Sequence, residues 1–335
     1  VENREQPKAF YELSNLDPSG NRELLVDIYY PSDSESSSIQ LFKDSPSNWG
    51  ETVVKYLNRT WGINIPTFLL SHLNLSYFDL ATDVKPLDGE FPVVIYTHGW
   101  AGEKIFATDQ LLTIASQGYI VIAIDHTGLS MFTELPNGTI FNTGSTEASS
   151  KVFDVMYEMS IDIENTLEYL NKNNLVNDLS VINLIGHSTG GGSAYLYCDR
   201  NECETLVLQD PFFVPVVSEY GGIIISSPTY FIYSEDWFKG NENINEMSEI
   251  EVYRNYLTAP CIGNTCEDYV KGFYLADSAH YDFVAFGAIS SLTKYTFLKG
   301  SIDYADSLKA NNRFNLEALK QSEITTDTLV IQIEK

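Results

Sequence analysis

Residues Val181–Ala194 read VINLIGHSTGGGSA. The apolar, β-prone residues at the start of this stretch predict a strand, and the residues after Ser188 can begin a helix. Between them lies a G-x-S-x-G sequence, with Gly186 and Gly190 on either side of the serine. In a strand-to-helix setting this sequence is typical of a nucleophile elbow, where small residues let the strand and the helix pass closely. We therefore predict that Ser188 is a nucleophile.

Alternating strands and helices surround this stretch. Short β-branched and aromatic runs predict six strands, at Glu23–Tyr30, Phe91–Thr97, Tyr119–Asp125, Val181–Gly186, Thr205–Asp210 and Thr229–Ser234. Apolar residues at helical spacing predict helices at Lys104–Ser116, Lys151–Leu170 and Ser193–Cys198. This pattern favours an α/β fold with a mostly parallel central sheet and helices on both faces. With the elbow, it predicts the α/β-hydrolase fold.

Two segments interrupt the alternation. An aromatic and aliphatic insertion occupies about residues 41–80. It either packs as helices on the sheet edge or forms a cap-like or interfacial surface that helps to hold a lipid substrate. The segment Met131–Ser150 is polar and contains Pro136-Asn137-Gly138, which predicts a surface loop. Since no repeat or low-complexity linker is visible, we expect a single domain over residues 1–335.

The net charge of −26, from 20 Lys and Arg against 46 Asp and Glu, bears on partners. It repels phosphate backbones at long range, so nucleic acid is not an expected partner. No apolar run approaches the roughly 20 residues that a membrane span needs, and we expect a soluble protein.

The four cysteines indicate the compartment. Cys198 and Cys203 bracket one short link, and Cys261 and Cys266 bracket another. Two local disulfides and an oxidising compartment are the favoured interpretation, although four cysteines permit three connectivities. A zinc site is disfavoured because no histidine lies near either pair. The chain begins at Val1 without an initiator methionine, as if a leader had been removed, so we expect a secreted or periplasmic protein.

A serine nucleophile needs a general base, and five histidines are candidates: His72, His98, His126, His187 and His280. In the α/β-hydrolase fold the order along the chain is serine, acid, histidine. Only His280 follows Ser188, and we predict it as the base. His187 lies inside the elbow, where we expect its side chain to point away from the reaction face of the serine.

The carboxylate that orients the base is ambiguous. Asp210 ends the strand after the elbow strand, and Asp236 follows the next strand along the chain. Most α/β-hydrolases take the acid from the later position, so spacing alone modestly favours Asp236. Both assignments stay open on this argument.

The oxyanion hole requires two backbone N–H groups near the nucleophile. Thr189 follows Ser188 directly and supplies one by position. The second is expected from the loop after an early strand, where Gly99 would let the backbone turn so that the Trp100 N–H faces the site.

Six blocks, in this order, resemble the plasma-type platelet-activating-factor acetylhydrolases and their microbial relatives. They are LVDIYYPSD, FPVVIYTHGWAG, ASQGYIVIAIDH, LIGHSTGGGSA, CETLVLQDPFFVP and DSAHYDFVAF, and they span roughly Leu24 to Phe286. The family's GHSxGG segment matches Ser188, its acid-bearing LDxWxF-like segment falls on Asp210, and its SxHxxF-like segment falls on His280. Its oxyanion donors fall on Trp100 and Thr189.

The chain departs from the animal members at three points: Pro211 follows the acid, Trp100 replaces a smaller apolar residue, and the cysteine pairs are its own. These departures concern the substrate range more than the mechanism.

The resemblance implies a serine esterase that hydrolyses short acyl esters of phospholipid-like substrates through an acyl-enzyme, with Ser188, His280 and Asp210 as the triad. No metal or organic cofactor is expected, and a transient contact with a lipid surface is. The alternatives are a general carboxylesterase, lipase or cutinase-like polyesterase, and a catalytically silent binding protein with the same fold.

Overall fold

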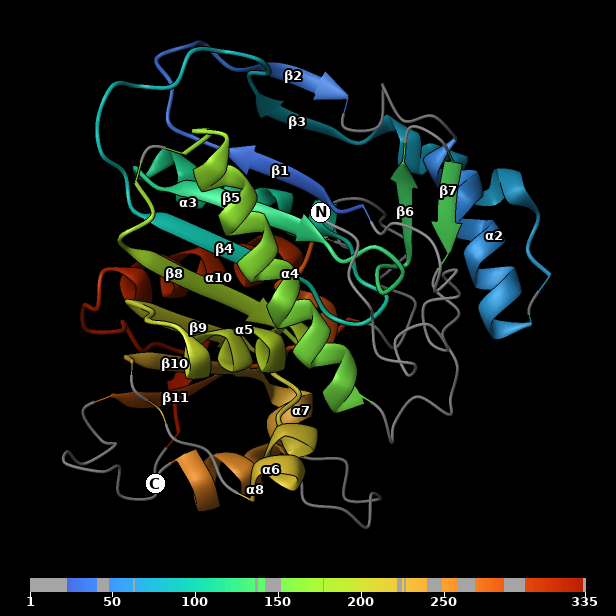
Figure 1. Cartoon of the computed structure of the whole chain (residues 1–335). Helices are drawn as coiled ribbons and strands as arrows, with labels where there is room; N and C mark the ends of the chain where they lie inside the picture. The colour runs from blue at the N-terminus through green and yellow to red at the C-terminus, as the bar shows by residue number, and fades with distance from the viewer. Residues whose placement is uncertain are drawn as a thin grey trace.

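A twisted eight-stranded sheet forms the centre of the molecule in the computed structural model (Figure 1). The structure describes residues 23–40, 48–62, 64–135, 138–141, 152–176, 178–221, 225, 227–239, 249–257, 269–285 and 299–333. In spatial order the strands are β1 (Leu25–Tyr29), β5 (Ile120–Asp125), β4 (Val93–Thr97), β8 (Ile182–His187), β9 (Thr205–Gln209), β10 (Thr229–Ser234), β11 (Val270–Leu275) and β12 (Val330–Gln332). Only the outer strands β1 and β12 run antiparallel to their neighbours within this sheet. The predicted mostly parallel sheet is confirmed, and the six predicted strands are β1, β4, β5, β8, β9 and β10.

Strands β11 and β12 were not predicted from the sequence. The β11 sequence VKGFYL has a lysine and a glycine near its start, which breaks the apolar run that marks a buried strand. The glycine, Gly272, lies against a neighbouring side chain: a Cβ atom there would be 2.4 Å from the Tyr253 ring. Strand β12 has three residues, too few for a pattern.

Helices cover both faces of the sheet, as predicted. Figure 1 shows α4 (Val152–Lys172) and α5 (Thr189–Arg200) on one face, and α3 (Thr108–Ser116) and α10 (Tyr304–Leu319) on the other. The fully buried β4 explains this arrangement. Val93 and Ile95 pack with α4 and α5, whereas Val94 and Tyr96 pack with α3 and α10. Successive side chains of a strand point to opposite faces, so a strand covered on both sides is apolar throughout.

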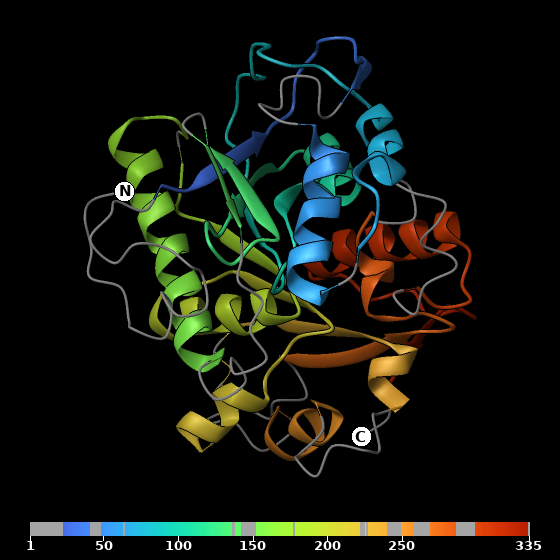
Figure 2. The same ribbon diagram turned by 90° about the vertical axis from the view of Figure 1, so that its right-hand side faces the viewer.

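The insertion is described from residue 48 onward. Helix α2 (Trp49–Trp61) is followed by a 3₁₀ helix, η1 (Thr67–Leu75), and by β3 (Tyr77–Leu80), which pairs with β2 (Ser37–Gln40). Trp49 packs against Phe106 and Phe132, with each pair of ring centroids 5.9 Å apart. Figures 1 and 2 place α2 beyond the carboxyl ends of β4, β5 and β8. The insertion therefore borders the edge of the sheet where ligands of α/β proteins bind.

The prediction of a surface loop at Met131–Ser150 is wrong for the part of this segment that the structure describes. Strands β6 (Phe132–Leu135) and β7 (Gly138–Phe141) form an antiparallel hairpin, and residues 142–151 lie outside the described residues. Phe132 and Leu135 are buried. Packing against the insertion thus outweighs the local polarity on which the prediction rested.

One predicted disulfide is present: Cys198, near the end of α5, is bonded to Cys203. The second predicted pair, Cys261 and Cys266, lies outside the described residues.

We expect the Cys198→Ser/Cys203→Ser double variant to melt a few degrees below the wild type and to keep its activity. The chain-entropy model assigns about 2 kcal/mol to a loop this short, a small effect on a chain of 335 residues. Differential scanning calorimetry measures the shift. An unchanged melting temperature would contradict the stabilising role of the bond.

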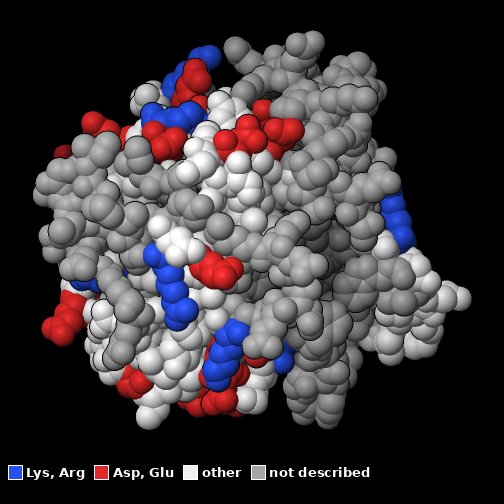
Figure 3. All heavy atoms as spheres, turned by 90° about the horizontal axis from the view of Figure 1, so that it is seen from below, with Lys and Arg blue, Asp and Glu red and all other residues white. Residues whose placement is uncertain are grey.

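Charged side chains of both signs share the surface. On the face seen in Figure 3, most of the visible Lys and Arg side chains lie close to Asp or Glu side chains. Within the described part of the chain, no helix is both long and apolar enough to cross a membrane.

Candidate active site

Ser188 occupies a strained turn between β8 and α5. Its φ of 57° and ψ of −124° place it in a region that residues with a Cβ atom rarely adopt. Close backbone packing surrounds the turn: a Cβ atom on Gly190 would lie 2.3 Å from the Thr97 carbonyl oxygen. The Ser188 N–H donates to the Gln209 carbonyl at 3.0 Å. This is the strand, turn and helix arrangement of a nucleophile elbow.

Asp210 and His280 form a hydrogen-bonded pair. Asp210 follows β9 and is fully buried, and its Oδ2 accepts from His280 Nδ1 at 3.1 Å. His280 begins a short 3₁₀ turn after β11, with 21% of its side chain exposed. The carboxylate also accepts from the Ser234 backbone N–H at Oδ1 and from the Ser234 hydroxyl at Oδ2. These donors fix the carboxylate against the imidazole.

The rival acid lies elsewhere. Asp236 is exposed in the first turn of α7 (Glu235–Lys239), where its backbone N–H donates to the Ser278 carbonyl at 3.2 Å. Of the two candidates, Asp210 is the one whose carboxylate the described structure brings to His280.

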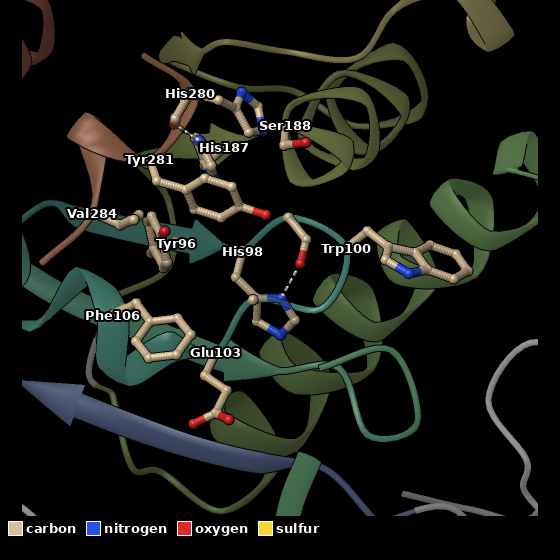
Figure 4. A pocket seen from close by; sticks show the side chains of 12 residues that line it. Tyr96, His98, Trp100, Glu103, Phe106, His187, Ser188, His280, Tyr281 and Val284 are labelled. Atoms are coloured by element: carbon tan, nitrogen blue, oxygen red, sulfur yellow. Dashed lines mark hydrogen bonds between the residues drawn. The ribbon is translucent and has the colours of Figure 1, made fainter. Parts of the chain in front are cut away.

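The His187 side chain lies on the other side from the one predicted. We expected its side chain to point away from the reaction face of Ser188, and this is wrong. The ring of His187 lies 4.6 Å from that of His280, and its Nε2 donates to the His280 carbonyl at 2.9 Å (Figure 4). Burial, reinforced by the neighbouring His280, holds the pKa of His187 well below its usual range. A neutral His187 therefore anchors the backbone of His280.

The loop after β4 lies directly against the serine. A Cβ atom on Gly99 would be 2.7 Å from the Ser188 Cβ, so only a residue without a side chain fits at this position. Trp100 follows, with its indole directed away from the other labelled residues in Figure 4. Thr189, the other expected oxyanion donor, is the first residue of α5 and is buried.

The side chain of His98 fixes the loop after β4 through a hydrogen bond to Gly99, a role that the sequence did not indicate. Burial lowers the pKa of His98 to about 4, so the ring is neutral at pH 7. Its Nδ1 donates to the Gly99 carbonyl at 2.7 Å, and its Nε2 accepts from the His126 N–H at 3.2 Å. The two contacts require one tautomer and fix the orientation of the Gly99 peptide.

A cavity of about 200 Å³ opens beside Ser188 and His280 (Figure 4). Its other lining residues include Tyr96, Glu103, Phe106, Tyr281 and Val284. Burial and the nearby Asp125 raise the pKa of Glu103 well above its usual range. Glu103 Oε2 accepts from Trp49 Nε1 at 3.3 Å, which ties the insertion to the cavity wall. In the described ranges, no three His, Cys, Asp or Glu side chains group in a way that could hold a metal ion.

A mostly parallel sheet with a serine at a strained strand-to-helix turn defines the protein as an α/β-hydrolase. The sequence model of the family "Platelet-activating factor acetylhydrolase, isoform II" matches residues 15–136 and 141–329. The chain belongs to this family of ester hydrolases, as the resemblance implied. The chlorophyllase family model also matches, over residues 82–199.

One solved structure shares the fold over nearly the whole chain. A ferulic acid esterase from Streptomyces cinnamoneus superposes with a TM-score of 0.69 at 18% identity, covering 99% of this chain and 93% of that one. Est1E from Butyrivibrio proteoclasticus, in a structure with ferulic acid bound, gives a TM-score of 0.41 at 13% identity, covering 69% and 90%. No curated protein sequence matches the chain significantly.

Proposed function

We propose that the protein is a serine esterase that hydrolyses short acyl esters of phospholipid-like substrates. The observation that carries this proposal is the Asp210–His280 hydrogen bond, formed beside a serine on a strained elbow. His280 takes the proton of Ser188 as the serine attacks the ester carbonyl, and Asp210 stabilises the resulting imidazolium. The N–H groups of Trp100 and Thr189 receive the oxyanion. Water then releases the acyl group by the reverse proton transfers.

The small volume of the cavity favours substrates with a short acyl group. Its volume of about 200 Å³ is below the roughly 300–1,000 Å³ of pockets that hold drug-sized ligands. A series of nitrophenyl esters of increasing chain length tests this, followed by a phosphatidylcholine with an acetyl ester. We expect the highest kcat/KM for the shortest acyl groups. A rate that increases steadily toward long chains would indicate a lipase instead.

Aromatic acyl esters are a second candidate substrate class. Tyr96, Phe106 and Tyr281 are among the aromatic residues that line the cavity, and a ferulic acid esterase shares the fold. Methyl ferulate in the same series separates the two candidates: a kcat/KM above that of the acetyl ester would favour this class.

An exposed apolar strip on the insertion supports contact with a lipid surface. Phe68 is 70% exposed, Leu75 63% and Tyr77 54%, and Leu69 adjoins Phe68. Large apolar side chains gathered on one exposed segment are typical of surfaces that bind other molecules or membranes. An extracellular or periplasmic location, which the Cys198–Cys203 disulfide supports, would place this strip among lipids outside the cytoplasm.

We expect the Phe68→Ser/Leu69→Ser variant to lose at least about tenfold in activity on an acetyl-ester phospholipid in phosphatidylcholine vesicles, since shallow insertion of such side chains contributes about 1–3 kcal/mol each. Hydrolysis of soluble nitrophenyl acetate should not change. Leu175→Ser, which alters a leucine that is 55% exposed outside the insertion, is the matched control. Equal vesicle activity in the variant and the wild type would remove this strip from the proposal.

A further inference from the structure

Two aromatic rings lie against the imidazole of His280, that of Trp237 stacked and that of His187 tilted. The Trp237 ring centroid lies 4.5 Å from that of His280 at an interplanar angle of 19°, and the His187 centroid lies 4.6 Å away at 35°. Asp210 at Nδ1 and the Tyr281 ring, edge-on at 5.3 Å, complete these surroundings. The imidazole is thus held in a mainly aromatic setting with one carboxylate.

The Ser234 hydroxyl contacts both the backbone of Trp237 and the carboxylate of Asp210. Its backbone N–H donates to Ser234 Oγ at 3.2 Å, and that hydroxyl donates to Asp210 Oδ2. The same carboxylate oxygen accepts from His280 Nδ1. Trp237 and His280 are therefore joined twice, through the hydrogen bonds of Ser234 and Asp210 and through the stacked rings.

The helix that carries Trp237 is also fixed to the His280 loop. The Glu235 N–H donates to Ser278 Oγ, and the Asp236 N–H donates to the Ser278 carbonyl, both at 3.2 Å. Ser278 precedes His280 by two residues. The indole is thus held against the imidazole before any substrate binds.

A fixed indole face attracts a cation, and tryptophan is the side chain that does so best. His280 becomes a cation only when it takes a proton. Burial and the neighbouring His280 keep His187, the other adjacent ring, neutral, so that it adds no positive charge beside the imidazolium. The contact with Trp237 is stronger in the protonated state, which is the condition for an interaction to accelerate a reaction.

We propose that Trp237 is a positioning residue that stabilises the imidazolium form of His280 by a cation–π contact. This inference rests on the proposed function, in which His280 takes the proton of Ser188 Oγ and later returns one to the serine.

The test compares Trp237→Leu, Trp237→Phe and Phe238→Leu over a pH–rate profile with nitrophenyl acetate. Phe238 is the matched control because it lies on the same helix and stacks on Tyr274, with ring centroids 4.7 Å apart. We expect Trp237→Leu to lower the plateau rate about tenfold and to move the acidic limb to lower pH, since the imidazolium loses its stabilising neighbour. Trp237→Phe should restore part of both effects, and Phe238→Leu should change neither.

A shift of the acidic limb of the pH–rate profile in Trp237→Leu would come from the loss of the indole, because the neighbouring titratable groups stay the same. Within the described part of the chain, the titratable and charged groups next to the imidazole are Asp210 after β9, His187 from β8, Tyr281 from its own turn, and Glu235 and Asp236 on α7. None of them is altered in the three variants. A lower plateau with an unmoved acidic limb and no rescue by phenylalanine would overturn the proposal, because lost packing alone would explain it.

An NMR titration of the His280 ring protons makes the test independent of catalysis. The proposal expects a lower titration midpoint in Trp237→Leu, and in Trp237→Phe a midpoint between that of Trp237→Leu and the wild type; if the leucine variant does not fold, the phenylalanine variant must still titrate below the wild type. An identical midpoint in the wild type and the folded variants would overturn it. A wild type that hydrolyses no ester would instead refute the proposed function, and the titration would still decide the contact.

Discussion

Replacing Ser188 with alanine is expected to reduce ester hydrolysis by about 10⁴- to 10⁶-fold while the protein remains folded. The members of a triad act as a unit, so the loss of the nucleophile removes nearly all of their combined effect. Alanine has a Cβ atom like serine and keeps the same backbone requirement at φ 57°. His280→Ala should cause a loss of similar size, because no other base contacts the buried carboxylate of Asp210 in the described structure.

The measurement is kcat/KM on nitrophenyl acetate, together with labelling by a fluorophosphonate probe. The wild type should take one label, at Ser188, and Ser188→Ala none. His72→Ala is the control for the histidine, since His72 is exposed on the insertion. Substantial activity in purified Ser188→Ala protein would refute the assignment of the nucleophile.

Asp210→Asn is expected to reduce turnover about 10⁴-fold, and Asp236→Asn tenfold at most. An asparagine keeps the shape of the side chain but can leave the histidine in the wrong tautomer, and it no longer stabilises an imidazolium. The Asp236 side chain is exposed, so its replacement by asparagine should have little effect on the site.

The two variants are each other's control, since both remove one negative charge on neighbouring segments of the sheet edge. Circular dichroism establishes that each is folded, and kcat is compared at the pH optimum. If Asp236→Asn is inactive and Asp210→Asn is not, the acid is Asp236 and the carboxylate that contacts His280 has only a structural role.

Local sequence patterns predicted the centre of the fold well. The buried strands β4, β5, β8, β9 and β10 were all identified, because strands that are buried on both faces are mainly apolar along their length. The patterns failed where burial depends on distant partners. Phe132 in a polar segment is buried because Trp49 covers it, and Gly272 in β11 is required by the ring of Tyr253.

The same distinction applies to the candidate site. The G-x-S-x-G motif selected Ser188, and chain order selected His280, since only one histidine follows the serine. Strand spacing could not choose the acid, because Asp210 and Asp236 both follow parallel strands that end at the same edge of the sheet. Ser234 could have been noticed as a donor at the end of the strand beside β9. The contacts of His187 and Trp237 with the His280 ring depend on side-chain packing, which leaves no pattern in the sequence.

The backbone of Ser188 also affects how this protein evolves. A φ of 57° with a ψ of −124° is a conformation that glycine adopts freely and that costs other residues about 1–3 kcal/mol. Selection for stability alone would therefore favour glycine at this position, and selection for turnover keeps the serine there. A descendant of this lineage that lost its substrate would be free to relax the turn, so the residue at position 188 records whether a relative still depends on its chemistry.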